Sequence, residues 1–229
     1  MKEEKTQVKS RERVVNHGEV FTSEREVNAM LDLVKDETDR IDSRFLEPAC
    51  GDGNFLAEIL NRKLRAVNRQ YGKSLPDYER FSILALMNIY GVDILLDNVE
   101  ECRSRLYDIW EEDYDKTTNN NGHENIRKAA RYILEKNILW GDALTMMQSD
   151  GQPIVFPEWS FVMGNQVKRR DFRLDGLMTD ENPNLAETNQ TSMFDSSDNW
   201  EFDKETQVKL PGPIKTYPLI DYRKVYEVE

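Results

Sequence analysis

The chain has 229 residues, which is enough for one domain with a sizeable core and extensions. Its 43 acidic and 31 basic residues give a net charge of −12, which argues against a free-standing nucleic-acid binder with a basic surface. Two histidines disfavour a histidine-based zinc site or a Ser-His-Asp triad, and two cysteines are too few for a disulfide framework.

The composition divides the chain into three regions. A charged N-terminal segment over 1–16 precedes an expected α/β domain over 17–172, and we expect 173–229 to form an acidic, partly disordered tail. Residues 216–222 of this tail, which is punctuated by proline, are a candidate edge strand. Because no apolar run suggests a signal peptide or a membrane span, we expect a soluble, cytoplasmic protein that contacts no membrane.

Helical and strand-like patterns alternate along the expected domain. Ser23 and Glu26 predict a capping box at the start of a helix over 23–34. A strand at 44–48, a glycine-rich loop and a helix follow one another, which is the opening unit of a doubly wound sheet. We predict helices at 55–69, 76–88, 96–110 and 123–137, strands at 89–94, 138–144 and 154–165, and a polar loop at 111–122.

The loop E-P-A-C-G-D-G-N-F at 47–55 carries the most information. Gly51 and Gly53 would let the backbone approach a ligand closely, and the following helix would point its positive end at that ligand. Leu56 stands where a dinucleotide-binding loop has its third glycine, which disfavours a bound NAD or FAD. A loop shaped only for tight packing between strand and helix is the alternative.

Three acids end successive predicted strands, at the edge where open α/β sheets bind ligands. They are Glu47, Asp93 and Asp142. Asp93 would accept hydrogen bonds from both hydroxyls of a ribose, as acids do in dinucleotide folds. Asp142 would accept one from an adenine amino group, or it would cap a following helix.

These motifs resemble those of adenine-N6 DNA methyltransferases. The loop at 47–55 is similar to the family's S-adenosylmethionine loop, and H-G-E-V-F-T-S at 17–23 to its N-terminal motif. Residues 91–94 and 141–144 resemble the next two cofactor motifs, in the order of the gamma-type enzymes and of restriction–modification methylation subunits. The resemblance covers 17–165 and implies a Rossmann-like class I methyltransferase fold that uses S-adenosyl-L-methionine.

The resemblance also implies a set of cofactor-binding residues. In the family, the residue matching Thr22 contacts the methionine part, and Ser23 replaces the usual proline. The implied set is Thr22, Glu47, Pro48, Ala49, Gly51, Gly53, Phe55, Asp93, Ile94, Asp142 and Ala143.

The catalytic motif of the family is only partly present. Residues 161–165 fit its fourth strand, so the resemblance implies that Asn165 is the catalytic asparagine that accepts a hydrogen bond from the target amino group. Gln166-Val167-Lys168 stands where the family has Pro-Pro-aromatic, so the stiff turn and the ring that stacks on a flipped base are missing.

The remaining expectations concern partners. Lys168, Arg169 and Arg170 would contact DNA phosphates, or they form a solvated or salt-bridged surface. The predicted sheet is truncated or rearranged after its fourth strand, and its open edge invites pairing with another chain. The expected function is adenine-N6 DNA methylation in a restriction–modification or mobile-element system, with another subunit supplying target recognition. Alternatives are a non-catalytic regulatory or assembly subunit and a methyltransferase for a protein or small molecule.

Overall fold

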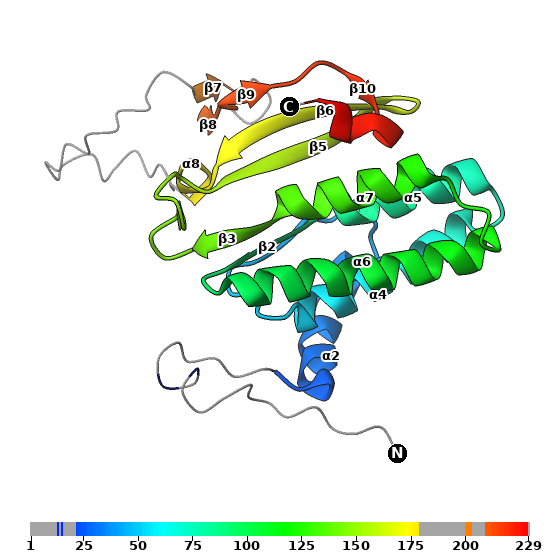
Figure 1. Cartoon of the computed structure of the whole chain (residues 1–229), viewed down its shortest axis with the longest axis horizontal. Helices are drawn as coiled ribbons and strands as arrows, with labels where there is room; N and C mark the ends of the chain where they lie inside the picture. Colours follow the sequence, from blue (N-terminus) through cyan, green and yellow to red (C-terminus); the bar gives the residue numbers. More distant parts are fainter. Residues whose placement is uncertain (1–12, 14, 16–21, 179–199, 203–208, 229) are drawn as a thin grey trace, which may run out of the picture.

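The computed structural model describes residues 13, 15, 22–178, 200–202 and 209–228 (Figure 1). The described part of the chain combines a small, mostly parallel sheet, helices packed against it and a second, antiparallel sheet. The expected α/β class is therefore confirmed. No helix in these ranges is long and apolar enough to cross a membrane.

The first sheet has the strand order β1-β2-β3-β4. Its strands are β1 (Phe45–Glu47), β2 (Ile89–Asp93), β3 (Ile138–Asp142) and β4 (Met147–Gln148). The first three are parallel, with Phe45 opposite Ile89 and Gly91 opposite Ile138, and β4 is antiparallel to β3. The carboxyl ends of β1, β2 and β3 consequently share one edge of the sheet.

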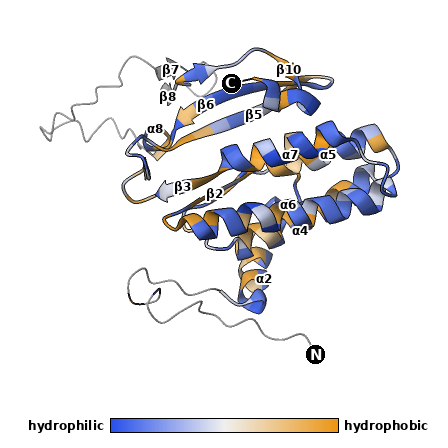
Figure 2. Cartoon of the chain, viewed as in Figure 1, coloured by the Kyte–Doolittle hydropathy of each residue, from blue (hydrophilic) through white to orange (hydrophobic). Residues whose placement is uncertain are grey.

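The helices precede, connect and flank these strands. They are α2 (Glu24–Asp32), α3 (Lys35–Thr38), α4 (Asn54–Tyr71), α5 (Leu75–Met87), α6 (Leu96–Thr118) and α7 (Glu124–Asn137). The predicted capping box is confirmed, since the Ser23 hydroxyl accepts from Glu26 N–H and the Glu26 carboxylate accepts from Ser23 N–H. Figure 2 shows alternating apolar and polar stripes along α4 and α6, as expected for amphipathic helices.

The polar loop expected at 111–122 is wrong for most of its length, because α6 continues to Thr118. Trp110 and Tyr114 are both fully buried, and their rings stack with centroids 4.8 Å apart. Their spacing of four places both on the inner face of the helix. Burial of these two rings outweighs the low helix propensity of the Asp and Thr residues around them.

The second sheet is built on a hairpin of β5 (Val155–Met163) and β6 (Gln166–Arg173). Our expectation that residues 154–165 form a fourth strand of the parallel sheet is wrong. Among the described residues, β5 pairs only with β6, in antiparallel fashion, and Gly164-Asn165 forms the turn between them. The basic stretch 168–172 lies within β6.

The C-terminal residues form further short elements, two of which make a separate two-stranded antiparallel sheet. They are α8 (Leu174–Met178), β7 (Trp200–Phe202), β8 (Lys209–Pro211), β9 (Lys215–Thr216), β10 (Ile220–Asp221) and the 3-10 helix η2 (Tyr222–Glu227). Strands β9 and β10 both pair with β6, so this part of the tail contributes short edge strands to the antiparallel sheet and none to the parallel one. Residues 179–199 and 203–208 of the tail, which we expected to be partly disordered, lie outside the described residues.

Two apolar clusters hold the layers together. The larger one joins α4, α5, α6 and α7 to the sheet. In the smaller one, Tyr90 and Val92 of β2 pack with Ile154, Phe156 and Leu174. We expected helices to cover both faces of the sheet. Instead, β5 and α8 contribute the cover at Tyr90 and Val92.

Candidate ligand site at the carboxyl end of the parallel sheet

The three predicted acids do end adjacent parallel strands. Glu47 is the last residue of β1, Asp93 of β2 and Asp142 of β3. Residues 48–53 connect β1 to α4 at the same edge of the sheet. The strand pairing therefore brings the glycine loop and the acids to one edge, as open α/β sheets do at their ligand sites.

The two loop glycines adopt backbone conformations that other residues rarely take. Gly51 has φ of 53° and Gly53 has φ of 88°. A Cβ on Gly53 would lie 2.8 Å from Cys102 Sγ on α6, closer than packing allows. The alternative reading of the loop thus holds at Gly53, where the missing side chain allows strand, loop and helix to pack tightly.

Asp93 fastens this loop to the end of β2. It is buried, and its Oδ2 accepts a hydrogen bond of 2.8 Å from Gly51 N–H. Its Oδ1 accepts from Leu95 N–H at 2.9 Å and from Asn98 Nδ2 at 3.2 Å. A carboxylate offers about four acceptor positions, so three hydrogen bonds leave Asp93 room for one more donor. Asp93 therefore both positions the loop and keeps an acceptor at the strand end.

A second ionic contact supports the loop from α6. Arg105 Nη2 lies 2.6 Å from Asp52 Oδ2, and its Nη1 donates to Asn54 Oδ1 at 2.6 Å. The other oxygen of Asp52, Oδ1, is buried without a hydrogen-bond partner. Sequence reasoning missed Arg105, because nothing in the local pattern of a long amphipathic helix shows which of its charges reaches a distant loop.

Glu47 lies beside an apolar cavity of about 220 Å³. The cavity is lined by residues of α2, β1 and α4, namely Met30, Leu31, Val34, Phe45, Leu46, Glu47, Phe55, Leu56 and Ile59. Burial raises the pKa of the Glu47 carboxyl, and a hydrogen bond from Ala49 N–H opposes this effect. Glu47 is thus a partly desolvated acid at the end of β1.

Asp142 is more open than Asp93. Its Oδ1 accepts from Leu144 N–H at 2.8 Å within a turn that leads into β4, so the alternative role as a helix cap is wrong. Large apolar side chains surround this part of the edge, with Ile94 54%, Trp140 40% and Leu144 94% exposed. Trp140 Nε1 donates to Ile94 O at 3.0 Å, which joins the ends of β2 and β3. The acids are therefore flanked by exposed apolar surface.

The other predicted cofactor residues lie around this edge with different exposure. Pro48 and Ala49 are exposed on the loop, and Phe55 is half-buried in the first turn of α4. Ala143 packs against the smaller apolar cluster. Thr22 is half-buried just before α2, and the preceding motif residues 17–21 lie outside the described residues.

Asn165 does not lie at the carboxyl edge of the parallel sheet, where the resemblance placed the catalytic asparagine. Ile154, just before β5, packs with Val92 near the carboxyl end of β2, and β5 then runs toward the other edge. Trp159, midway along β5, donates to Asn137 Oδ1, one residue before β3 begins. Asn165 lies six residues further on, exposed in the turn, with its C=O accepting from Tyr222 N–H at 2.9 Å.

The three basic residues of the predicted DNA contact differ in burial and pairing. Arg169 is 9% exposed, and its guanidinium donates to Asp171 at 2.7 and 2.8 Å and to the Tyr132 hydroxyl at 2.8 Å. Arg170 donates to Glu158 Oε2 through Nε at 2.8 Å. Lys168 is half-buried on the same strand. Arg169 is thus a buried structural cation, and the salt-bridged alternative describes this stretch better than a phosphate-binding loop.

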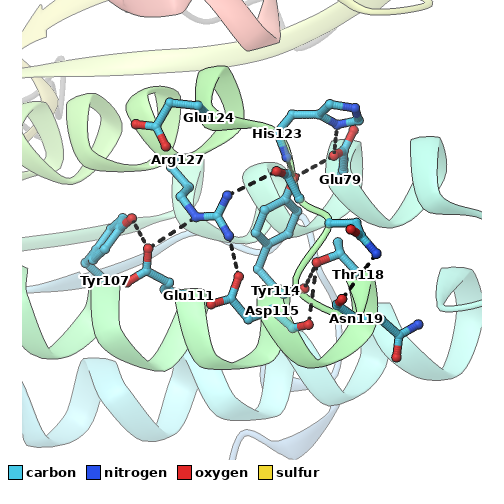
Figure 3. A network of polar contacts seen from close by, with 12 residues as sticks. Glu79, Tyr107, Glu111, Tyr114, Asp115, Thr118, Asn119, His123, Glu124 and Arg127 are labelled. Carbon is cyan, nitrogen blue, oxygen red and sulfur yellow. Dashed lines mark hydrogen bonds and ion pairs between the residues drawn. The ribbon is translucent and has the colours of Figure 1, made fainter.

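A separate polar network joins α5, α6 and the start of α7 (Figure 3). The buried Glu79 carboxylate accepts from the Tyr114 hydroxyl at 2.6 Å and lies 2.7 Å from His123 Nδ1. Arg127 forms ion pairs with Asp115 and Glu111 of α6. Because these groups satisfy one another, the network holds the helices together.

Comparison of the chain with protein-family models, with curated proteins and with solved structures found no match. Within the described ranges, no group of three or more His, Cys, Asp or Glu residues is placed to hold a metal ion. Function is therefore inferred from the chemistry at the carboxyl edge of the parallel sheet.

Proposed function

We propose that this chain is an S-adenosyl-L-methionine-binding module with a Rossmann-like methyltransferase fold. It would serve an adenine-N6 DNA methylation system of the restriction–modification or mobile-element type. The observation that carries the proposal is the meeting of a glycine loop with Asp93 and Asp142 at the ends of three adjacent parallel strands. This is the edge at which folds of this class bind nucleosides.

Each part of the edge suits a part of the cofactor. The remaining acceptor position of Asp93 would accept from one ribose hydroxyl in this proposal, and Asp142 would accept from the adenine amino group. The exposed side chain of Ile94 lies between these acids in the chain and offers an apolar surface to the adenine ring. The loop at 48–53 and the first turn of α4 would receive the methionine part.

The proposal assigns binding of the target base to another subunit. Adenine methylation requires acceptors that hold the target amino group next to the methyl donor. Asn165, the predicted acceptor, lies at the far end of β5 in a hairpin turn. The pairing of Arg169 and Arg170 with acids and the net charge of −12 likewise favour DNA contact through a partner. A methyltransferase for a protein or small molecule is the second candidate, since it needs no such asparagine.

Calorimetric titration with S-adenosylmethionine, S-adenosylhomocysteine, ATP and NAD tests the cofactor assignment. We expect heat with the first two ligands and none with NAD. Ile94→Asp should weaken binding about tenfold by placing a charge against the adenine. Leu219→Asp is the matched control, because Leu219 is 53% exposed and Ile94 is 54% exposed. ATP binding as tight as that of S-adenosylmethionine would instead indicate a general adenine-nucleotide site.

Transfer of labelled methyl groups tests the division of labour between subunits. The chain alone should leave mixed genomic DNA unlabelled, and a subunit encoded by a neighbouring gene should restore transfer. Labelling of DNA by the isolated chain would contradict the assignment of target binding to a partner. Labelling of a protein or a small molecule by the isolated chain would favour the second candidate.

A further inference from the structure

Strand β1 is the outer strand of the parallel sheet. Within the described residues it pairs with β2 alone, with Phe45 N–H donating to Asn88 O at 3.0 Å. Successive backbone groups of a strand point to opposite sides, so Leu46 presents its N–H and C=O to the open side. No described residue forms a hydrogen bond with these groups. An open edge of this kind is a template for another strand.

The cavity of about 220 Å³ lies next to this open edge. It is smaller than typical pockets for drug-sized ligands, which are roughly 300–1,000 Å³, and it is lined almost entirely by apolar side chains. Three of its lining residues are themselves exposed, with Met30 at 53%, Val34 at 45% and Leu46 at 37%. This combination fits one apolar side chain of a segment that lies along β1.

The charge around the edge restricts the kind of partner. Residues 22–47, which include α2 and β1, carry eight acidic and four basic side chains. A second copy of this chain would bring the same acidic segment, and the net charge of −12 opposes that contact. A segment with basic residues complements the edge, and its charge would also speed association.

We propose that the open edge of β1 and its cavity bind an extended, basic segment of another protein. The segment adds a strand beside Leu46 and inserts one apolar side chain between α2 and α4. Because Glu47 belongs both to this edge and to the candidate ligand site, the docked partner lies next to that site. The inference rests on β1 and α2, and it holds whether or not the ligand site binds S-adenosylmethionine.

Fluorescence anisotropy with labelled peptides tests this docking surface. The probe is Lys-Val-Lys-Leu-Lys-Val-Lys, compared with the same peptide carrying Glu for Lys and with one carrying Pro for both Val residues. At about 0.15 M salt we expect the lysine peptide to bind at least tenfold more tightly than either control, since only it combines charge, strand formation and an apolar anchor. Equally tight binding of the proline peptide would mean that charge alone accounts for the affinity, and it would overturn strand addition.

Two substitutions on α2 locate the peptide. Met30→Lys should weaken binding of the lysine peptide about tenfold, because Met30 lines the cavity. Leu33→Lys adds the same charge at a side chain that is 86% exposed and outside the cavity, so it should leave binding within about twofold. Circular dichroism of both variants checks the fold. An equal loss in both variants would overturn the proposal, as would a dimer of this chain that Met30→Lys dissociates.

Discussion

Two glycine-containing strand ends look alike in sequence and differ in structure. Gly141 precedes Asp142 at the end of β3, and a Cβ there would lie 2.6 Å from Met147 O. Gly164 precedes Asn165 with φ of 56°, and no atom lies within 4 Å of its Cβ position. The first glycine allows β4 to pack closely beside an acid at the ligand edge. The second forms a hairpin turn. A Gly-Asp or Gly-Asn pair therefore indicates a candidate ligand site only where it ends a strand of the parallel sheet, and not where it joins two antiparallel strands.

The largest effect on stability is expected from the buried Arg169–Asp171 ion pair of the β5–β6 hairpin. Arg169→Ala leaves the Asp171 carboxylate buried without its cation and with the Tyr217 hydroxyl as its remaining side-chain donor, so unfolding in urea should show a loss of about 3–5 kcal/mol. Lys168→Ala, on the same strand but less buried, should change stability by less than about 0.5 kcal/mol. A loss below about 1 kcal/mol for Arg169→Ala would mean that its ion pair does not hold the hairpin, and would reopen a role in phosphate binding.

The parallel region buries a cation in another way. Lys63 Nζ is fully buried and donates to the carbonyl oxygens of Arg40, Ile41 and Ser43 at 2.6–3.0 Å. Burial lowers the pKa of Lys63 from about 10.5 to about 7. Between these pH values the unfolded chain binds a proton that the folded chain has released, so stability contributed by this group rises with pH.

The difference in unfolding free energy between the wild type and Lys63→Met, followed against pH, isolates the contribution of Lys63, since both proteins have the same other titrating groups. From about pH 7 to about pH 10, the wild type should gain on the order of 3 kcal/mol relative to the variant, measured by urea unfolding. Parallel pH profiles for the two proteins would show that the ammonium group stays charged on its three carbonyl partners. The parallel half would then bury Lys63 as a charged group, as the hairpin buries Arg169.

A smaller difference in stability loss is expected between alanine substitutions at Gly53 of the loop and at Gly164 of the hairpin. Gly53→Ala combines a left-handed backbone with a contact to Cys102 Sγ, so it should lose about 2–3 kcal/mol. Gly164→Ala has only the backbone term and should lose about 1 kcal/mol. Equal losses would mean that α6 moves to accommodate the methyl group and that tight packing does not fix the loop.

Local signals in the sequence predicted much of the parallel half. Ser23 and Glu26 mark the start of α2, and the strand, glycine loop and helix at 44–71 follow in immediate succession. These signals work because caps, turns and apolar periodicity act over a few residues. The partners of Asp93 and Arg105 were not predictable, because those contacts cross between elements far apart in the chain.

The hairpin was misread for two physical reasons. Strand periodicity does not encode whether a strand pairs in parallel or antiparallel fashion. A two-residue Gly-Asn loop between strands is itself a hairpin signal, and it was available at Gly164-Asn165. In addition, β6 buries Arg169 and Asp171 on the same face as Val167, so a strand with a buried face has the composition of a surface loop.

The smallest effects on stability are expected at the two strand ends, Asp142 after β3 and Asn165 after β5. Ligand binding should distinguish these two positions. Asp142→Asn and Asn165→Ala should each change unfolding by less than about 0.5 kcal/mol, because both side chains are at least partly exposed and Asn165 contributes only its backbone C=O to Tyr222. Calorimetry should nevertheless distinguish them. For the proposed cofactor site, we expect Asp142→Asn to weaken S-adenosylmethionine binding about tenfold by replacing a charged acceptor, and Asn165→Ala to leave it unchanged. Weaker binding in Asn165→Ala would require the hairpin turn to reach the ligand, which the antiparallel course of β5 opposes.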